Sequence, residues 1–283
     1  MPPGPSWDWI HAACRASPCL THLATSQFSL DWFPASNLRQ LTCLELLDVP
    51  MPMSTAFHLL EQVTLLESFS IKVEGPAVAR STGGVLVTKS VSTVEITCHW
   101  HLGQFLEQLE FPCLENISIR QVLVWPETEF HSFLSRSACA LKTLELYNVH
   151  APEERIIACL QHKACHTLES LVCNPYTADA ILQHLTYREG WFPNPKLRAI
   201  DIGDIHTTDG RLSVMVESRL FLPTIADGVL VPERLQKVRF SFQDGLSVSQ
   251  SITHTKDWTG LWEAKMKALE LGLKVEIAYN RHS

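Results

Sequence analysis

The chain has 283 residues and a formal net charge of −7, with 46% hydrophobic and 19% charged residues. This composition is too apolar for a disordered chain and is rich enough to bury a substantial core. The acidic balance, without any run of basic residues longer than two, excludes the clustered basic footprint of a nucleic-acid-binding protein.

The sequence also bears on membrane insertion and compartment. Acidic residues, lysine or histidine interrupt every apolar stretch well before the ~20 residues that a transmembrane helix needs. Asp8, His11 and Arg15 lie where a signal peptide would need an apolar run, so we expect an intracellular protein, in the cytoplasm or the nucleus. In such a compartment the cysteines are expected to be free thiols, most of them small buried side chains.

One apolar pattern recurs along the chain: an apolar residue followed by further apolar residues three and five positions later. The clear copies begin at Leu41, Leu66, Val91, Leu114, Leu141, Leu168, Leu197 and Leu235, after a degenerate copy at Leu20. The clear starts are 25, 25, 23, 27, 27, 29 and 38 residues apart. All but the last interval lie within, or at the edge of, the range of leucine-rich repeats.

The physics of this pattern predicts the fold. The last two apolar residues of each copy alternate with an outward one, so each copy predicts a short strand with one apolar face. A single unit cannot bury that face, whereas stacked units form a parallel sheet over one continuous core. We therefore predict an α/β leucine-rich-repeat solenoid of about eight to ten repeats, with strands on the concave face and helices on the convex face.

Crossover helices are expected between the strands. Ser54 is the expected N-cap of the first helix, and Pro152 followed by two glutamates predicts the start of another. The expected helical segments are 56–64, 101–109, 128–138, 152–163, 177–188 and 209–220. Apolar residues replace the usual asparagine three positions after the strand, so the turn is expected to be held by apolar packing. These residues are Val49, Val122, Val149 and Ile205.

We expect residues 1–283 to form a single leucine-rich-repeat domain with covered ends, because an open solenoid must shield its terminal apolar faces. Residues 1–40 are expected to form an N-terminal cap and the degenerate first repeat. Residues 41–255 carry the regular repeats, with an insertion at 203–233, and 256–283 form a C-terminal cap of a helix and a strand.

Two groups of histidine and cysteine residues have the spacing of zinc ligands. They are Cys98, His99 and His101, and Cys159, His162, Cys165 and His166. In both groups we favour buried thiols, and in the second also a histidine that stabilises a helix end, over a metal site. We also expect the Glu153–Glu154 pair to mark the start of a helix rather than to act as an acid and a base.

Catalytic signatures are missing from the sequence. It contains neither a phosphate-binding glycine loop ending in Gly-Lys-Ser/Thr nor a Gly-x-Ser-x-Gly nucleophile motif. We therefore predict that the protein is not an enzyme, and that it has no cofactor, no metal and no catalytic residues.

The strand residues that point away from the core define a predicted binding face on the concave side. The central outward positions are Glu45, Ser70, Glu95, Ser118, Glu145, Val172, Asp201 and Arg239, and Lys72, Arg120, Tyr147 and Asn174 flank them. Half of the central positions are acidic, which predicts a broadly negative stripe for a protein partner with a basic or mixed-charge segment. The predicted partner-binding residues are Glu45, Glu95, Arg120, Glu145, Tyr147, Asp201 and Arg239. The alternative is a solvated face that only keeps the protein soluble.

Three segments, LTCLELLDVPMP, HLGQFLEQLEFPCLENISI and LSRSACALKTLELYNV, carry a resemblance to a known family. The chain resembles, from about Leu20 to Phe242, the repeat region of the F-box-like proteins of mushroom-forming fungi. In that family the F-box docks on the Skp1 subunit of a cullin ubiquitin ligase, and the repeats are thought to present substrates. The resemblance implies substrate recognition, whereas Skp1 docking is left open because no recognisable F-box precedes the repeats here.

The leading hypothesis is a non-catalytic protein–protein interaction scaffold, for which the resemblance implies substrate recognition in a Skp1-cullin-F-box-type ubiquitin ligase. The first alternative is an enzyme or a small-ligand-binding protein with a pocket between the 203–233 insertion and the sheet. Its titratable candidates are His206, Asp209 and Asp227. The second alternative is a truncated duplicate without a partner.

Overall fold

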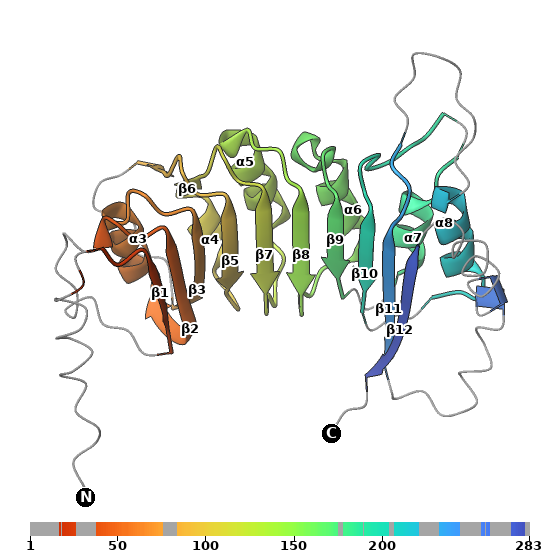
Figure 1. Ribbon diagram of the computed structural model, residues 1–283, viewed down its shortest axis with the longest axis horizontal. Coiled ribbons are helices and arrows are strands. Elements are labelled where there is room, and N and C mark those ends of the chain that lie inside the picture. Colours follow the sequence, from red (N-terminus) through yellow and green to blue (C-terminus); the bar gives the residue numbers. More distant parts are fainter. Residues whose placement is uncertain are drawn as a thin grey trace, which may run out of the picture. The chain divides into compact units, whose positions relative to one another are not determined.

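The structure is a computed structural model of residues 1–283 (Figure 1). The described residues are 17, 19–26, 38–75, 84–174, 178–188, 190–203, 207–220, 232–243, 256–257, 259–260 and 273–280. The chain divides into two compact units, one made of Met1–Val122 and Thr128–Cys139 and the other of Leu123–Glu127 and Ala140–Ser283. Each unit combines parallel strands with helices, which confirms the predicted α/β class.

The first unit contains a main sheet with the strand order β1-β2-β3-β5-β7, in which every neighbouring pair is parallel. The strands are β1 (His22–Thr25), β2 (Cys43–Pro52), β3 (Ser68–Glu74), β5 (Thr93–Thr97) and β7 (Asn116–Arg120). Buried and half-exposed side chains alternate along β3 and β5, so one face of the sheet points into the core. The strands predicted from the apolar pattern, including the degenerate copy at Leu20, are confirmed in this unit.

Helices cover the buried face of this sheet (Figure 1). They are α3 (Met53–Gln62), α4 (Leu102–Leu106) and α5 (Glu127–Ser137), which belongs to this unit from Thr128 onward. Phe57 of α3 stacks on Phe105 of α4, with ring centroids 5.1 Å apart. Phe111 meets the rings of Phe69 and Phe133 edge-on, at 5.7 and 5.8 Å. These buried rings therefore join the helices to the sheet through favourable aromatic geometry.

The start of α3 differs from the sequence prediction. The helix begins at Met53, directly after Pro52, so Ser54 lies inside the first turn and does not cap the helix. Proline suits this position because it has no backbone N–H and its φ angle is already fixed near the helical value. The predicted side-chain cap is therefore wrong: the N-cap residue is Pro52, and the helix start has no side-chain cap hydrogen bond.

A second small sheet in this unit was not predicted. The helix expected over 101–109 ends at Leu106, and the chain continues into β6 (Leu109–Glu110). This short strand pairs in parallel with β4 (Leu86–Val87). Strands of two residues are too short to produce an alternating apolar signal, which is why the pattern did not show them.

The second unit contains parallel strands in the order β8-β9-β10-β11-β12. The strands are β8 (Thr143–Tyr147), β9 (Ser170–Cys173), β10 (Ala199–Ile202), β11 (Lys237–Gln243) and β12 (Lys274–Asn280). The helical elements are α6 (Glu153–Gln161), the 3₁₀ turn η2 (Lys163–Cys165), α7 (Asp179–Leu185) and α8 (Arg211–Leu220). The helices lie on one face of these strands (Figure 1). Strand β12 confirms the predicted final strand of the C-terminal cap, whereas residues 261–272 of the predicted cap helix lie outside the described residues.

One backbone arrangement recurs before the strands of both units. In most copies of the apolar pattern, the residue directly after the first apolar residue has a carbonyl that accepts hydrogen bonds from two consecutive N–H groups. These N–H groups lie at the start of the next strand of the sheet. Glu67 O, for example, accepts from Ser92 N at 2.8 Å and from Thr93 N at 3.0 Å. The same double acceptance occurs at the carbonyls of Thr21, Thr42, Ser92, Lys142, Glu169 and Arg198. It brings each strand into register with the preceding one at equivalent positions of the pattern.

The turn after the strand is also built alike in the two units. Gln121 in the first unit and Asn148 in the second have left-handed φ angles of 59° and 52°. Each is followed by a buried valine, Val122 or Val149. Apolar packing was predicted at these two turns and is confirmed here. It was also predicted at Val49, which is instead half-buried within β2, and at Ile205, which lies outside the described residues.

In the second unit, acidic residues at the start of one helix bond the start of the next helix. Glu153, the first residue of α6, accepts through Oε2 from the N–H groups of Ala180 and Ile181 in α7, at 2.6 and 2.9 Å. Asp179, the first residue of α7, accepts from the N–H of Thr208 at 2.7 Å, shortly before α8 begins. Free N–H groups make a helix start electropositive, so each carboxylate stabilises the neighbouring helix as well as its own.

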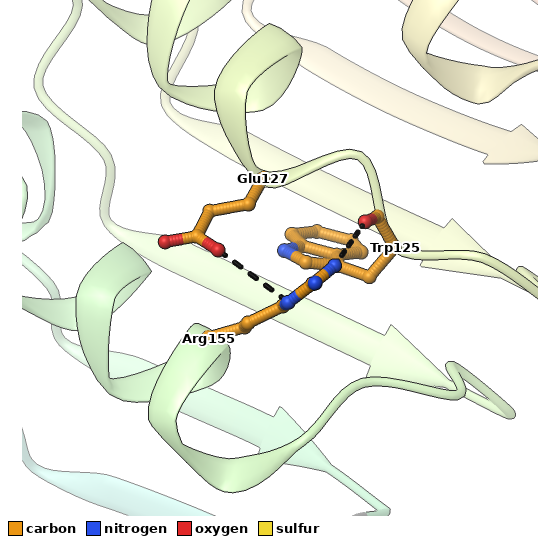
Figure 2. A network of polar contacts seen from close by, with 3 residues as sticks. All are labelled: Trp125, Glu127 and Arg155. Atoms are coloured by element: carbon orange, nitrogen blue, oxygen red, sulfur yellow. Dashed lines mark hydrogen bonds and ion pairs between the residues drawn. The ribbon is translucent and has the colours of Figure 1, made fainter.

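Figure 2 shows a related contact at the start of α5, in the part of that helix that belongs to the second unit. The Nε atom of Arg155 in α6 lies 3.5 Å from Oε2 of Glu127, and its Nη1 atom donates to the carbonyl of Trp125 at 3.2 Å. The Trp125 side chain is buried. Arg155 therefore holds the backbone in place at the buried Trp125, just before α5 begins.

Arginines bind the opposite, electronegative ends of helices. In the first unit, Nη2 of Arg136 donates to the carbonyl of Leu106, the last residue of α4, at 2.7 Å. In the second unit, Nε of Arg219 donates to the carbonyl of Leu185, the last residue of α7, at 2.6 Å. Both contacts satisfy a carbonyl that has no partner within its own helix and place a cation at the negative end of the helix dipole.

Candidate partner-binding face

The open face of each sheet is the face opposite the helices, and the predicted binding residues lie on it. In the first unit the central outward positions are aligned across neighbouring strands in the order Glu45, Ser70, Glu95, Ser118. A second aligned row contains Lys72, Thr97 and Arg120. These rows form because each outward residue occupies the same position of the apolar pattern and the strands pair in register.

Ion pairs neutralise much of the charge on this open face. Arg120 Nε lies 3.2 Å from Glu95 Oε1 on the neighbouring strand. Lys72 Nζ lies 3.3 Å from Glu74 Oε1 on the same strand. All four side chains are partly exposed, so each pair contributes only about 0–1 kcal/mol and exchanges readily with an incoming charge.

In the second unit the central row is Glu145, Val172, Asp201, Arg239 and Glu276. Arg239 Nη1 lies 3.5 Å from Asp201 Oδ2. Burial raises the pKa of the Asp201 carboxyl above its ordinary value, and Glu276 adds to this, although Arg239 and Lys237 partly oppose it. The surroundings of Asp201 thus disfavour ionisation of its carboxyl.

A basic row runs beside the central row on the last two strands. Lys237 is aligned with Lys274, and both side chains are exposed. Lys274 forms an ion pair with Glu276 and lowers the pKa of the Glu276 carboxyl. Together with Arg239, these lysines balance the acidic residues, so the described open face carries paired charges rather than a broadly negative stripe.

Burial reduces the contact area that some central positions offer. Ser118 and Val172 are only 8% and 9% exposed, whereas Glu45, Glu95, Glu145 and Tyr147 are half-buried. The two nearly buried positions contribute little surface for a partner. A partner on the open face would therefore contact mainly the charged side chains and Tyr147.

A pocket of about 260 Å³ lies in the first unit, just after the carboxyl ends of β3 and β5. Its lining residues are Val73, Glu74, Gly75, Cys98, His99, Trp100 and His101. Cys98 is buried, which raises the pKa of its thiol even though the N–H groups of His101 and Trp100 point to the sulfur. The first of the two His/Cys groups thus lines a pocket, with a thiol that stays protonated at neutral pH.

The second His/Cys group is divided between the core and the surface. Cys159 and Cys165 are buried, and His166 is exposed. Burial raises the pKa of the Cys159 thiol, and nearby Cys165 adds to this effect. The Nδ1 atom of His162 accepts from the N–H of Ala164 at 3.2 Å and caps the 3₁₀ turn η2. Within the described ranges, no group of three or more histidine, cysteine or acidic residues is arranged to hold a metal ion.

The cysteines of the described ranges are free thiols, and most of them are buried. Burial raises the pKa of Cys139 to about 11 and that of Cys173 to about 12. These thiols remain protonated at neutral pH and act as small apolar side chains in the core.

One of the titratable residues proposed for a pocket beside the 203–233 insertion, Asp209, forms hydrogen bonds with the protein backbone. Asp209 uses both carboxylate oxygens to accept from the backbone N–H groups of Lys256 and Asp257, at 3.1 and 2.9 Å. It is thus part of a structural contact. His206 and Asp227 lie outside the described residues.

Some residues of the open face and its pocket were missed by the sequence interpretation. Lys237, Lys274 and Glu276 occupy outward positions beside Arg239, and the alternation of Leu273, Val275 and Ile277 was the signal that could have located Lys274 and Glu276. Trp100 carried no periodic signal because it follows the strand. Its side chain is 64% exposed.

Comparisons of this chain with protein-family models, with curated proteins and with solved structures found no match. Among the described helices, none combines the length and the apolar character needed to cross a membrane.

Proposed function

We propose that the chain is a leucine-rich-repeat solenoid that acts as a non-catalytic scaffold and binds a protein partner through the open face of its parallel strands. The observation that carries this proposal is the register, because it aligns equivalent outward residues of successive apolar patterns into continuous rows. Repeat proteins use such extended rows as binding surfaces.

Two further contacts support the repeat architecture. The doubly accepting carbonyl recurs before successive strands, as at Thr42, Glu67 and Ser92. Side chains at the helix starts also bond the next helix along the chain, as Glu153 does with α7. A solenoid is stabilised mainly by contacts between neighbouring repeats.

The partner that fits this face has a mixed-charge surface. Glu95 and Asp201 already have basic neighbours on the face, so a purely basic segment would have to displace Arg120 and Arg239. A partner with alternating charges would instead exchange these weak surface pairs for intermolecular ones. Among the described residues, neither Glu45 nor Glu145 has an ion-pair partner, so both half-buried acids are available to a cation of the partner.

Substrate recognition in a cullin ubiquitin ligase is the specific role we propose from the resemblance to F-box-like proteins. The open face would then bind the substrate. Affinity purification of the tagged chain from its native cells tests this role, because a cullin and Skp1 among the captured proteins would support it. Capture of other proteins without either subunit would overturn this role while leaving the scaffold proposal in place.

The scaffold proposal is tested by charge reversal on the open face. The double variant Glu95→Lys and Glu145→Lys should reduce capture of the partner by at least about fivefold at low salt, because it removes electrostatic complementarity. The loss should shrink at high salt, where screening weakens exposed charge pairs. The readout is the amount of each captured protein relative to the tagged chain, measured by quantitative mass spectrometry.

The matched control is the double variant Glu107→Lys and Glu154→Lys. Both glutamates are exposed on the helical side, in the turn after α4 and in the first turn of α6, and the net charge changes by the same amount. This control should retain the partner. Equal loss in both double variants, or no loss in either, would refute the open face as the binding surface.

A further inference from the structure

The lining of the pocket at the ends of β3 and β5 includes buried apolar side chains, a tryptophan and an acid. Val73 and Cys98 are 1% and 2% exposed and form the buried part of its lining. The Trp100 side chain is 64% exposed, and the Glu74 side chain is 48% exposed. An indole this open to solvent beside an apolar floor is unusual for a large aromatic residue, which is normally mostly buried.

The size of the pocket limits what it can hold. Its volume of about 260 Å³ is below the roughly 300–1,000 Å³ of pockets that take drug-sized ligands. A single amino-acid side chain is the occupant that matches this volume. The pocket is thus suited to anchoring one residue of a larger molecule.

The chemistry of the lining selects a cationic side chain with an aliphatic stem. An indole face attracts a cation, and a carboxylate binds one through charge-assisted hydrogen bonds. Methylene groups of the stem would lie against Val73 and Cys98, as long basic side chains commonly do on apolar surfaces. Arginine fits better than lysine because its planar guanidinium stacks on an indole and bonds a carboxylate with two N–H groups.

The pocket continues the open face of the first unit. Lys72 and Glu74 lie on the same strand, and Lys72 is aligned with Thr97 and Arg120 in the outward row next to the pocket. An extended segment lying along this row would reach the pocket at the carboxyl end of β3. We propose that this pocket receives an arginine side chain of the partner protein, an inference that rests on the scaffold function proposed above.

Lys72 acts as an internal competitor for the incoming guanidinium. Its Nζ atom lies 3.3 Å from Glu74 Oε1, and the two side chains are 24% and 48% exposed. Such a surface pair is weak and exchanges readily. Removing the Lys72 charge should therefore strengthen binding, whereas removing the Glu74 charge should weaken it.

The test uses the full chain and a small probe, N-acetyl-arginine methylamide, with the citrulline analogue as a neutral probe of nearly the same shape. Binding is followed by the indole N–H resonance of Trp100 in two-dimensional NMR spectra. The chain has eight tryptophans, so the resonance is assigned by its absence in Trp100→Phe. We expect a saturable shift with the arginine probe and about tenfold weaker binding of the citrulline probe, the size of one lost charge-assisted contact.

Two variants make the assignment specific. Glu74→Gln should weaken arginine binding about tenfold, and Lys72→Gln should strengthen it several-fold. Both substitutions are at exposed or half-buried positions, so the fold should be retained, and unchanged resonances of the core verify this. Equal binding of the arginine and citrulline probes, or the absence of any saturable shift of the Trp100 resonance, would overturn the arginine pocket.

The outcomes separate this inference from the proposed function. Loss of partner capture in the Glu95→Lys, Glu145→Lys variant without any arginine-dependent shift at Trp100 would sustain the scaffold and refute the pocket. Arginine binding at Trp100 with capture unaffected by that double variant would sustain the pocket chemistry and refute the open face as the binding surface.

Discussion

Asp209 and Asp257 each accept a hydrogen bond that holds the other's chain segment in place. Asp209 Oδ1 accepts from the N–H of Asp257 at 2.9 Å, and Asp257 Oδ1 accepts from the N–H of Ser213 in α8 at 3.0 Å. The Asp257 side chain is 1% exposed. The two carboxylates thus hold Lys256 and Asp257 against the start of α8.

Replacing Asp257 by alanine should lower the free energy of unfolding by about 1–3 kcal/mol, because the buried N–H of Ser213 loses its acceptor. Asparagine keeps an acceptor oxygen and should cost less. Urea denaturation measures both variants. The double variant with Asp209→Ala should lose less than the sum of the single losses, because either substitution releases the same contact. Strict additivity would contradict this coupling.

Glu153→Ala should destabilise the chain by about 0.5–2 kcal/mol, since the N–H groups of Ala180 and Ile181 lose their carboxylate cap. The same variant should increase hydrogen exchange at those two amides. Glu154→Ala is the matched control, because Glu154 is the next acid in the same first turn and is exposed. It should lose only the weaker helix-dipole contribution. A larger effect at Glu154 would show that the cap on α7 is unimportant.

Asp179 should make stability depend on pH in the acidic range. Burial is the largest single influence and opposes ionisation, but the hydrogen bonds from Thr207 and Thr208, with Arg211 nearby, outweigh it and lower the pKa of this carboxyl. A carboxyl with a lowered pKa in the folded state stabilises the protein above its unfolded pKa. That contribution is lost as pH falls through the folded pKa.

Asp179→Asn should therefore reduce the loss of stability on acidification, measured by urea denaturation at a series of pH values. Thr207→Val combined with Thr208→Val should have the same effect, because the hydroxyl groups that favour the ionised carboxyl are gone. An unchanged pH profile in both variants would rule out Asp179 as the titrating group.

Arg219 is fully buried, and among the described residues its guanidinium is held by neutral oxygens. It donates to Leu185 O, Tyr187 Oη and Pro193 O at 2.6, 3.0 and 2.8 Å and lies 4.1 Å from the centre of the Tyr187 ring. Burial lowers the pKa of this guanidinium to about 10, which leaves it charged at neutral pH.

Arg219→Met should destabilise the second unit by about 2–5 kcal/mol, because it leaves buried carbonyl groups without donors. Arg219→Lys should rescue little of this, since one ammonium group cannot reach acceptors in three directions. Tyr187→Phe retains the ring beneath the cation and should cost clearly less than either. Thermal and urea denaturation distinguish these variants. A stable Arg219→Met protein would show that the guanidinium is not needed to join α7 and α8.

The strands were predictable because their signal is local. Alternation of apolar residues, as at Val94 and Ile96, directs side chains to one face of a strand regardless of what lies beside it. The same rule located the outward residues Glu95 and Asp201 and the final strand β12. Helix ends were less predictable, as Ser54 shows, because the helix begins at Met53, before the serine that was expected to cap it.

The long-range contacts within the second unit were not predictable from the sequence. Glu153 and Ala180 are 27 residues apart, and Ser213 and Asp257 are 44 residues apart. No local pattern relates such positions, because their distance depends on how many residues each loop and helix takes between strands. The charge pairing of the open face has the same origin, since Glu95 and Arg120 meet only when β5 and β7 pair in register.

The sequence by itself thus determined the α/β class, the strands and the direction of their side chains, since these follow from the alternation of residues along a strand. Only the tertiary structure decided which charges neutralise each other and which carboxylate caps which helix. It also decided that Glu74 and Trp100 share one pocket. Those relations depend on which segments distant in the chain become neighbours, and that is decided only when their apolar faces pack together and their backbones form hydrogen bonds.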